Sequence, residues 1–337
     1  NVKAFKNFIS EVKLDGDLEN TILDFKTLKY FAPQLEGNTI KASISGNVYG
    51  YVDNFKINNI RIATDDGGFS TTVNGRMAGI PDIENTMLDA TISKSLFTLD
   101  GMGKFLSAWI KDGELDLSRY GKGLLFTLDG TAKGLLNDFD ASISAGSLAG
   151  SIDADMKVSN VIDVETPISI SGNISTDDLD IGRITGMELI RQITLDTKLD
   201  VKLTEVPELN IRNLSVDRMH INGYDYQGIS ATGILADNLF NGWITCHDPN
   251  LFFMLRGAMS LAPKGRDAVY GFELHVGDAN LNAINIDKRG KSYFNLSSNV
   301  NFVKMADGTL SGKIDITDVM LENRLGKHMI GKIGLNF

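Results

Sequence analysis

The sequence of 337 residues contains one cysteine (Cys246), four histidines, two tryptophans and six prolines. A single cysteine excludes an intramolecular disulfide, and with so few histidines it leaves no thiolate-rich metal site. No stretch without charge is longer than 12 residues, and residues 141–152, one such stretch, are rich in Gly and Ser. A membrane-spanning helix needs about 20 apolar residues. The sequence therefore predicts neither a disulfide scaffold nor a membrane span.

Basic residues are in the minority, because 33 Lys and Arg stand against 43 Asp and Glu. The net charge of −10 repels phosphate backbones and anionic lipid surfaces. We therefore expect neither nucleic acid nor a basic-patch attachment to a membrane as the partner of this chain.

Glutamate is scarce as well, with 11 residues against 32 aspartates, 27 asparagines and 34 glycines. Asp, Asn and Gly favour tight turns, whereas Glu favours helices. This composition argues against a helical bundle or an α/β enzyme and predicts many short strands joined by turns.

Alternation of apolar and polar residues is the dominant pattern. It is longest from Ile193 to Leu203, with Thr197 as a small polar interruption, and it recurs from Phe294 to Phe302, interrupted by Ser298. Strands with one apolar face belong to an antiparallel or solenoidal sheet with a single buried side. Turn signals separate the runs at Asp65–Gly68, Asp129–Gly130, Asn222–Gly223 and Asp307–Gly308.

A loose repeat accompanies the strands in residues 45–55, 74–83 and 129–139. Each copy has two glycines four residues apart, then an Asp or Asn turn and an apolar residue. On a strand, that spacing places both glycines on one face, where a neighbouring backbone approaches or the sheet bends. The repeat is either structural periodicity or chance repetition in a Gly-rich β protein.

Three segments interrupt the strand pattern. We expect short helices at Lys104–Ile110, around residues 187–191, and more weakly at Leu28–Pro33. The chain reads as one β-rich segment of a longer protein, with a possible subdivision into 1–176 and 177–337.

No motif supports catalysis or cofactor binding. Gly290-Lys291-Ser292 resembles the end of a phosphate-binding loop, but Asn285 stands where that loop needs glycine. Asp15 begins a calcium-like loop that lacks the required glycine and glutamate. We expect no enzyme, no metal and no cofactor.

The apolar faces allow two interpretations. They form the core of a closed sandwich, or they remain partly open as a groove for acyl chains, which would exceed the apolar patch that monomers normally expose.

Several stretches resemble the periplasmic portion of TamB-like proteins, which belong to the AsmA-like group of Gram-negative bacteria. They are residues 28–33, 45–55, 78–83 and 179–186, and most closely Asn222–Ile229 and Phe240–Asn250. The resemblance covers nearly the whole chain, although its motifs are loose.

The resemblance implies a curled β-taco whose apolar trough carries phospholipids across the periplasm, within a protein that is anchored in the inner membrane outside this segment. It also implies a link to an outer-membrane barrel partner. The alternative is a scaffold for barrel or autotransporter assembly that carries no lipid. The residues expected to line the trough are Ile40, Ile44, Met156, Val158, Ile193, Leu195, Leu199, Val201, Leu203, Phe253, Leu255, Phe272, Leu274, Val276, Phe294, Leu296, Val300 and Phe302.

Overall fold

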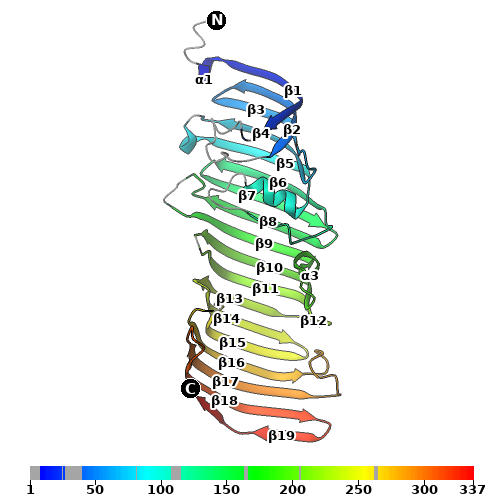
Figure 1. The fold of residues 1–337 in the computed structure, drawn as a ribbon, viewed down its shortest axis with the longest axis vertical. Coiled ribbons are helices and arrows are strands. Elements are labelled where there is room, and N and C mark those ends of the chain that lie inside the picture. Colours follow the sequence, from blue (N-terminus) through cyan, green and yellow to red (C-terminus); the bar gives the residue numbers. More distant parts are fainter. Residues whose placement is uncertain are drawn as a thin grey trace. The chain divides into compact units, whose positions relative to one another are not determined.

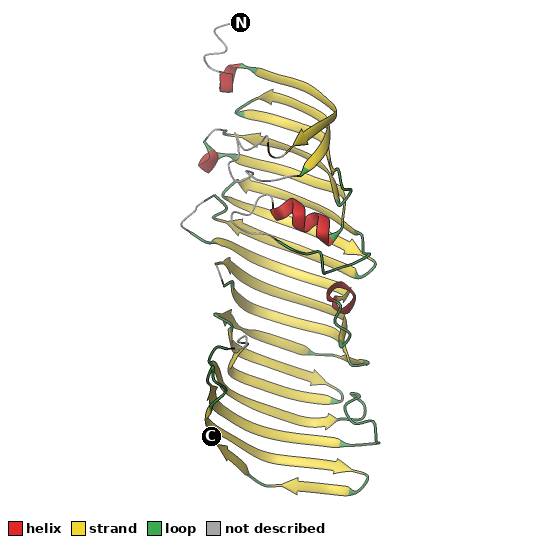
Figure 2. Cartoon of the chain, viewed as in Figure 1, coloured by secondary structure: helices red, strands yellow, loops and turns green. Residues whose placement is uncertain are grey.

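The computed structural model describes residues 8–24, 26, 40–80, 82–107, 115–162, 166–204, 206–261 and 265–337. Within these ranges the chain forms twenty strands, three short α-helices and one 3₁₀ helix (Figures 1 and 2). The strands join in antiparallel ladders that make one open sheet. The all-β antiparallel class expected from the alternation is confirmed.

The chain divides into two compact units. The first unit comprises Asn1–Ile168 and Asp178–Glu188, and the second comprises Ser169–Asp177 and Leu189–Phe337. The chain passes between them within strand β9, Ile168–Asp180.

The first unit holds eight complete strands, each paired with the strand before it in the ladders from β1 to β8. These strands are β1 (Lys13–Asp24), β2 (Lys41–Tyr51), β3 (Asn54–Thr64), β4 (Phe69–Ala78), β5 (Met87–Phe97), β6 (Phe126–Leu135), β7 (Asp138–Ser147) and β8 (Gly150–Ser159). Its helices are α1 (Phe8–Glu11), the 3₁₀ helix η4 (Ile83–Asn85), α2 (Leu99–Ser107) and α3 (Ile181–Thr185).

The second unit continues in the same way, except that β11 pairs with both β12 and β13, and β18 with both β19 and β20. Its strands after β9 are β10 (Ile190–Leu203), β11 (Glu208–Ile221), β12 (Tyr224–Tyr226), β13 (Ile229–Ala236), β14 (Leu239–Asp248), β15 (Leu251–Ser260), β16 (Ala268–Asn280), β17 (Tyr293–Lys304), β18 (Leu310–Asn323), β19 (Gly326–Ile330) and β20 (Ile333–Asn336).

Little of the apolar surface is sealed from solvent. The accessible surface is 20331 Å² for 36.7 kDa, whereas a compact monomer of that mass exposes about 13,500 Å². Strand β7 is typical, because Phe139, Ala141 and Ile143 are half-buried while the alternating Asp140 and Ser142 are exposed. The described strands therefore form one layer with an apolar and a polar side, rather than a closed sandwich.

The glycine repeat is structural. Its second glycines, Gly50, Gly79 and Gly134, have φ angles of +134°, +120° and +146°. A Cβ at these positions would lie 2.4, 2.9 and 2.6 Å from a backbone oxygen of the following segment. Only glycine adopts this conformation and allows such close approach without strain. Because the copies fall on or directly after β2, β4 and β6, the repeat marks every second strand.

One expected turn is wrong. Asp129-Gly130 lies inside β6, and the ladder continues through it to β7. A Cβ at Gly130 would lie 2.8 Å from Ser142 O, so this glycine also permits strand approach. The Asp129 carboxylate accepts the Lys94 N–H at 3.0 Å, where β5 carries a bulge. The other three turn signals do lie between strands.

The first expected helix exists but begins earlier. Helix α2 starts at Leu99 rather than Lys104 and is described as far as Ser107. Trp109 and Ile110 lie outside the described residues, as does the candidate helix Leu28–Pro33.

The second expected helix, at residues 187–191, is wrong in position. Helix α3 spans Ile181–Thr185 instead, because the Asp180 carboxylate caps it by accepting the Arg183 N–H at 2.8 Å. Gly186, with a φ angle of +80°, ends the helix in the left-handed conformation before Met187. Strand β10 then begins at Ile190.

Replacing Gly257 by Ala should destabilise the second unit by about 2 to 3 kcal/mol. Its φ angle is +137°, and a Cβ would lie 2.3 Å from Gly271 O. The matched control is Gly271→Ala, where a Cβ meets no atom within 4 Å and the change should stay within about 0.5 kcal/mol. Urea unfolding followed by circular dichroism measures both, and equal midpoints for the two variants would contradict this explanation of Gly257.

Candidate functional site

In the second unit, apolar side chains of eight strands, from β10 to β18 without the short β12, stand in four rows across the sheet. Paired residues of antiparallel strands project to the same side, so the register defines each row. We call these rows the apolar face of the second unit. They are Leu195–Val216–Ile229–Cys246–Phe253–Val276–Leu296; Thr197–Leu214–Ala231–Ile244–Leu255–Leu274–Ser298–Ile316; Leu199–Ile211–Gly233–Gly242–Gly257–Phe272–Val300–Ile314; and Val201–Leu209–Leu235–Phe240–Met259–Tyr270–Phe302–Gly312.

No residue of these four rows is charged. Two of the polar ones, Thr197 and Ser298, satisfy their hydroxyls on neighbouring strands. Thr197 Oγ1 donates to Asn213 O at 2.9 Å, and Ser298 Oγ donates to Asp315 O at 3.2 Å. A satisfied hydroxyl presents little unpaired polarity to an apolar ligand. The rows therefore remain apolar where the sequence alternation is interrupted.

The expected lining residues are mostly neither buried nor fully exposed. Ile193 and Val300 are buried, Leu203 is 45% exposed at the end of β10, and the other fifteen are intermediate. Side chains in this range shield one another within the layer while leaving the face accessible from one side. The four expected residues Ile40, Ile44, Met156 and Val158 belong to the first unit, and the remaining fourteen to the second.

The first unit also has an apolar face, but its residue composition differs. Two rows cross all eight strands, and one of them consists largely of glycine and alanine. The rows are Leu14–Gly50–Phe55–Met77–Leu88–Gly134–Phe139–Val158 and Gly16–Val48–Ile57–Gly75–Ala90–Ala132–Ala141–Met156. The sequence reasoning missed Ala90 and Ala132, because small residues give a weak hydropathy signal. It also missed Ile314 and Ile316, although these alternate with Lys313 and Asp315.

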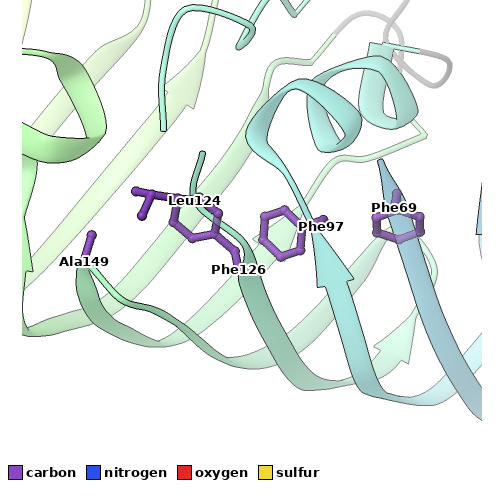
Figure 3. Close-up of a cluster of buried hydrophobic side chains, with 5 residues drawn as sticks. All are labelled: Phe69, Phe97, Leu124, Phe126 and Ala149. Carbon is purple, nitrogen blue, oxygen red and sulfur yellow. The ribbon is translucent and has the colours of Figure 1, made fainter. Parts of the chain in front are cut away.

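Helix α2 covers part of the first unit's sheet. Phe69, Phe97 and Phe126 are buried together with Leu124 and Ala149, as the close-up in Figure 3 shows, and residues of α2 and α3 pack against them. The Phe105 ring stacks on Phe69 with centroids 4.2 Å apart. This cluster is the largest group of buried apolar side chains among the described residues.

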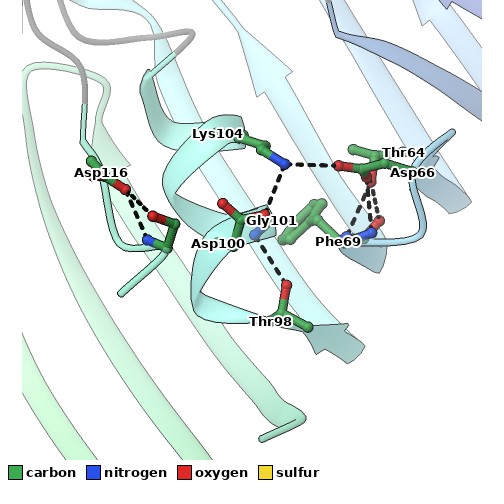
Figure 4. A network of polar contacts seen from close by, with 10 residues as sticks. Thr64, Asp66, Phe69, Thr98, Asp100, Gly101, Lys104 and Asp116 are labelled. Carbon is green, nitrogen blue, oxygen red and sulfur yellow. Dashed lines mark hydrogen bonds and ion pairs between the residues drawn. The ribbon is translucent and has the colours of Figure 1, made fainter. Parts of the chain in front are cut away.

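A polar network fixes α2 to the turn between β3 and β4 (Figure 4). Asp66 Oδ1 accepts the Thr64 hydroxyl at 2.7 Å and the Gly68 N–H at 2.9 Å, and these bonds hold the pKa of Asp66 below 3.8. Lys104 on α2 lies 2.7 Å from Asp100 and 3.7 Å from Asp66. Its pKa is raised, chiefly by Asp100.

The two stretches that resemble the TamB-like pattern most closely, Asn222–Ile229 and Phe240–Asn250, are joined by hydrogen bonds in the second unit. Tyr224 Oη donates to Asp248 Oδ1 at 2.6 Å, and the Gln227 N–H donates to Asp248 Oδ2 at 3.0 Å. Asn250 Nδ2 donates to Tyr224 Oη at 3.0 Å. Burial is the main cause of the raised pKa of Tyr224, which favours the protonated phenol that donates to Asp248. This arrangement joins the segment after β12 to the turn between β14 and β15.

The described residues contain no group of three or more His, Cys, Asp or Glu side chains arranged to hold a metal ion. None of the helices in that part of the chain has the length and apolarity to span a bilayer. No protein-family model, no curated protein and no solved structure matches this chain.

Lowering the pH should weaken the attachment of α2 to the sheet, because Asp66 becomes protonated. Because the folded pKa of Asp66 lies below 3.8, its stabilising effect is present above that value and is lost as the pH falls through the folded pKa. We expect the amide protection factors of α2 to fall as the pH is lowered from 4 through the depressed pKa of Asp66. Asp66→Asn should lower them already at pH 5, while Asp140→Asn on β7 should not. Hydrogen exchange measures this, and unchanged protection in Asp66→Asn at pH 5 would refute the attachment.

Proposed function

We propose that this chain is a lipid-carrying segment of a periplasmic protein of the TamB-like type, whose apolar faces hold phospholipid acyl chains as they pass between the inner and outer membranes. The observation that carries the proposal is the apolar face of the second unit. It is uncharged across eight strands, most of its residues are partly exposed while Val216, Ala231, Phe240, Cys246 and Val300 are buried, and within the described residues no second sheet covers it. Exposed apolar surface of this extent marks an interaction site.

The dimensions of this face suit an acyl chain. Neighbouring strands lie about 4.8 Å apart, so a row across eight strands is about 34 Å long. One leaflet of hydrocarbon is about 15 Å thick, half of the apolar core of a bilayer. An acyl chain of that length lies along a row with room to move.

The free energy of a bound acyl chain should change little as the chain moves along a row. Each buried CH₂ contributes about 0.8 kcal/mol, so a lipid does not leave for water readily. A step along the row exchanges one set of aliphatic or aromatic contacts for another, because no charge interrupts it. The polar face, with Lys198, Asp200, Glu273 and His275, supplies solubility on the other side.

A second function, a scaffold that carries no lipid, is favoured by helix α2. The side chains of the aromatic cluster around Phe69 and Phe105 cover part of the first unit's sheet. A scaffold needs buried clusters of this kind and makes no use of an open face. It predicts that the purified chain retains no lipid.

Charge on the apolar face should abolish lipid retention. We expect Leu274→Asp and Leu296→Asp each to reduce bound phosphatidylglycerol at least about tenfold, because acyl contact would desolvate the new carboxylate. The matched control is Asn301→Asp, an exposed position on the opposite face of β17, beside Lys313. Native mass spectrometry after incubation with the lipid gives the bound fraction, and circular dichroism verifies folding.

Two results would contradict the proposal. One is a wild-type chain without bound lipid, which favours the scaffold. The other is equal lipid retention in the wild type and in all three folded variants.

A further inference from the structure

Two turns at one end of the β17–β18 ladder gather positive charge in an otherwise acidic chain. Residues 286–292 lead into β17, and residues 323–326 connect β18 to β19. They contribute Lys288, Arg289, Lys291 and Arg324, and Lys327 follows. The net charge of −10 gives no sign of this cluster. The local sequence gives none either, because the two turns lie more than thirty residues apart.

The two turns are in contact. The side chain of Arg324 lies across Gly290, such that a Cβ at Gly290 would meet Arg324 Cδ at 3.2 Å and Nε at 3.3 Å. A cavity of about 310 Å³ lies between the turns, lined by Asp287, Arg289, Gly290, Lys291, Asn323, Arg324 and Leu325. Because residue 290 is glycine, the side chain of Arg324 can lie against it and form one wall of the cavity.

Asp287 neutralises only one of these cations. Its carboxylate accepts from Arg289 Nε at 2.9 Å and from Arg289 Nη2 at 3.2 Å, and this pairing lowers the pKa of Asp287 to about 2. Among the described residues, no carboxylate lies within ion-pair distance of Lys288, Lys291 or Arg324. All three side chains are exposed. The cavity therefore has an excess of positive charge that is free to meet an anion.

The cavity lies just beyond the end of the β17–β18 ladder, and Leu325 in its lining is apolar. The last pairs of the β17–β18 ladder are Phe294 with Leu321 and Tyr293 with Glu322. Lys291 is three residues from Phe294, which is about 10 Å along a strand. Two aliphatic side chains on the same turns face solvent, Ile286 at 64% and Leu325 at 89% exposed. An anion in the cavity would therefore sit beside apolar surface.

We propose that Lys291 and Arg324 bind the phosphate of a lipid headgroup at this edge while the acyl chains lie on the apolar face of the second unit. Arginine pairs with two phosphate oxygens, and lysine acts as a point charge. The proposal rests on the proposed function, because the same cations would also accept free phosphate.

The test compares two double variants that each remove one lysine and one arginine, at opposite ends of β17. Lys291→Gln with Arg324→Gln alters the cavity, and Arg266→Gln with Lys304→Gln alters the other end of β16 and β17. Calorimetric titration at low salt uses three probes: dihexanoyl phosphatidylglycerol, dihexanoylglycerol without phosphate, and inorganic phosphate.

We expect the cavity variant to bind dihexanoyl phosphatidylglycerol about tenfold more weakly and dihexanoylglycerol within about twofold of the wild type. The control variant should match the wild type with every probe. Undiminished phosphatidylglycerol binding by the cavity variant would overturn the headgroup site while leaving acyl binding intact. Phosphate binding that the cavity variant loses, with no binding of either acyl probe to the wild type, would overturn the lipid assignment and the proposed function together.

Discussion

Antiparallel pairing in a fixed register is the constraint on which the other features of this protein depend. Each ladder aligns an apolar residue with an apolar residue of the next strand, and a slip of one residue would move every side chain to the opposite face. The row from Leu199 through Phe272 to Ile314 exists only because eight strands keep this parity. The register turns a local two-residue alternation into a continuous apolar face.

Bulges and glycines allow this parity to survive in long strands. Register shifts occur between Leu18 and Thr21 in the β1–β2 ladder and between Lys198 and Leu199 in the β10–β11 ladder, and the rows resume beyond them. Bulges increase the local twist and bend of a strand. Glycines at positive φ, such as Gly257 and Gly312, bring backbones close beside Phe272 and Phe302. The strands of the first unit curve around the buried cluster in Figure 3.

An uncovered apolar face lowers the stability that a sheet gains from burial, because half-exposed side chains contribute only part of their transfer free energy. In the described part of the chain, local contacts offset part of this loss of stability. In the first unit α2 and the cluster around Phe97 supply buried contacts, and in the second unit the Tyr224–Asp248 pair fixes two turns. In each unit the apolar rows of the described residues remain without a second covering sheet, which a ligand-binding face requires. Lys291 and Arg324 line a cavity at the end of the β17–β18 ladder in the same unit.

The sequence by itself determined the all-β class and the two-sided strands, since period-two alternation is a local property. It determined the apolar parity of residues such as Leu274 and Leu296 for the same reason. It showed the glycine repeat but left open whether the repeat is structural, which the positive φ angles and close strand approach decided. Apolar periodicity misplaced α3, because the position of a helix this short depends on the Asp180 cap and on Gly186. The turn pattern misread Asp129-Gly130, because strand approach and tight turns favour the same residues. Only the tertiary structure decided that the apolar rows of each unit stay uncovered by a second sheet and that Lys291 and Arg324 line one cavity. Both depend on contacts between segments far apart in the chain, whose energies no local pattern encodes.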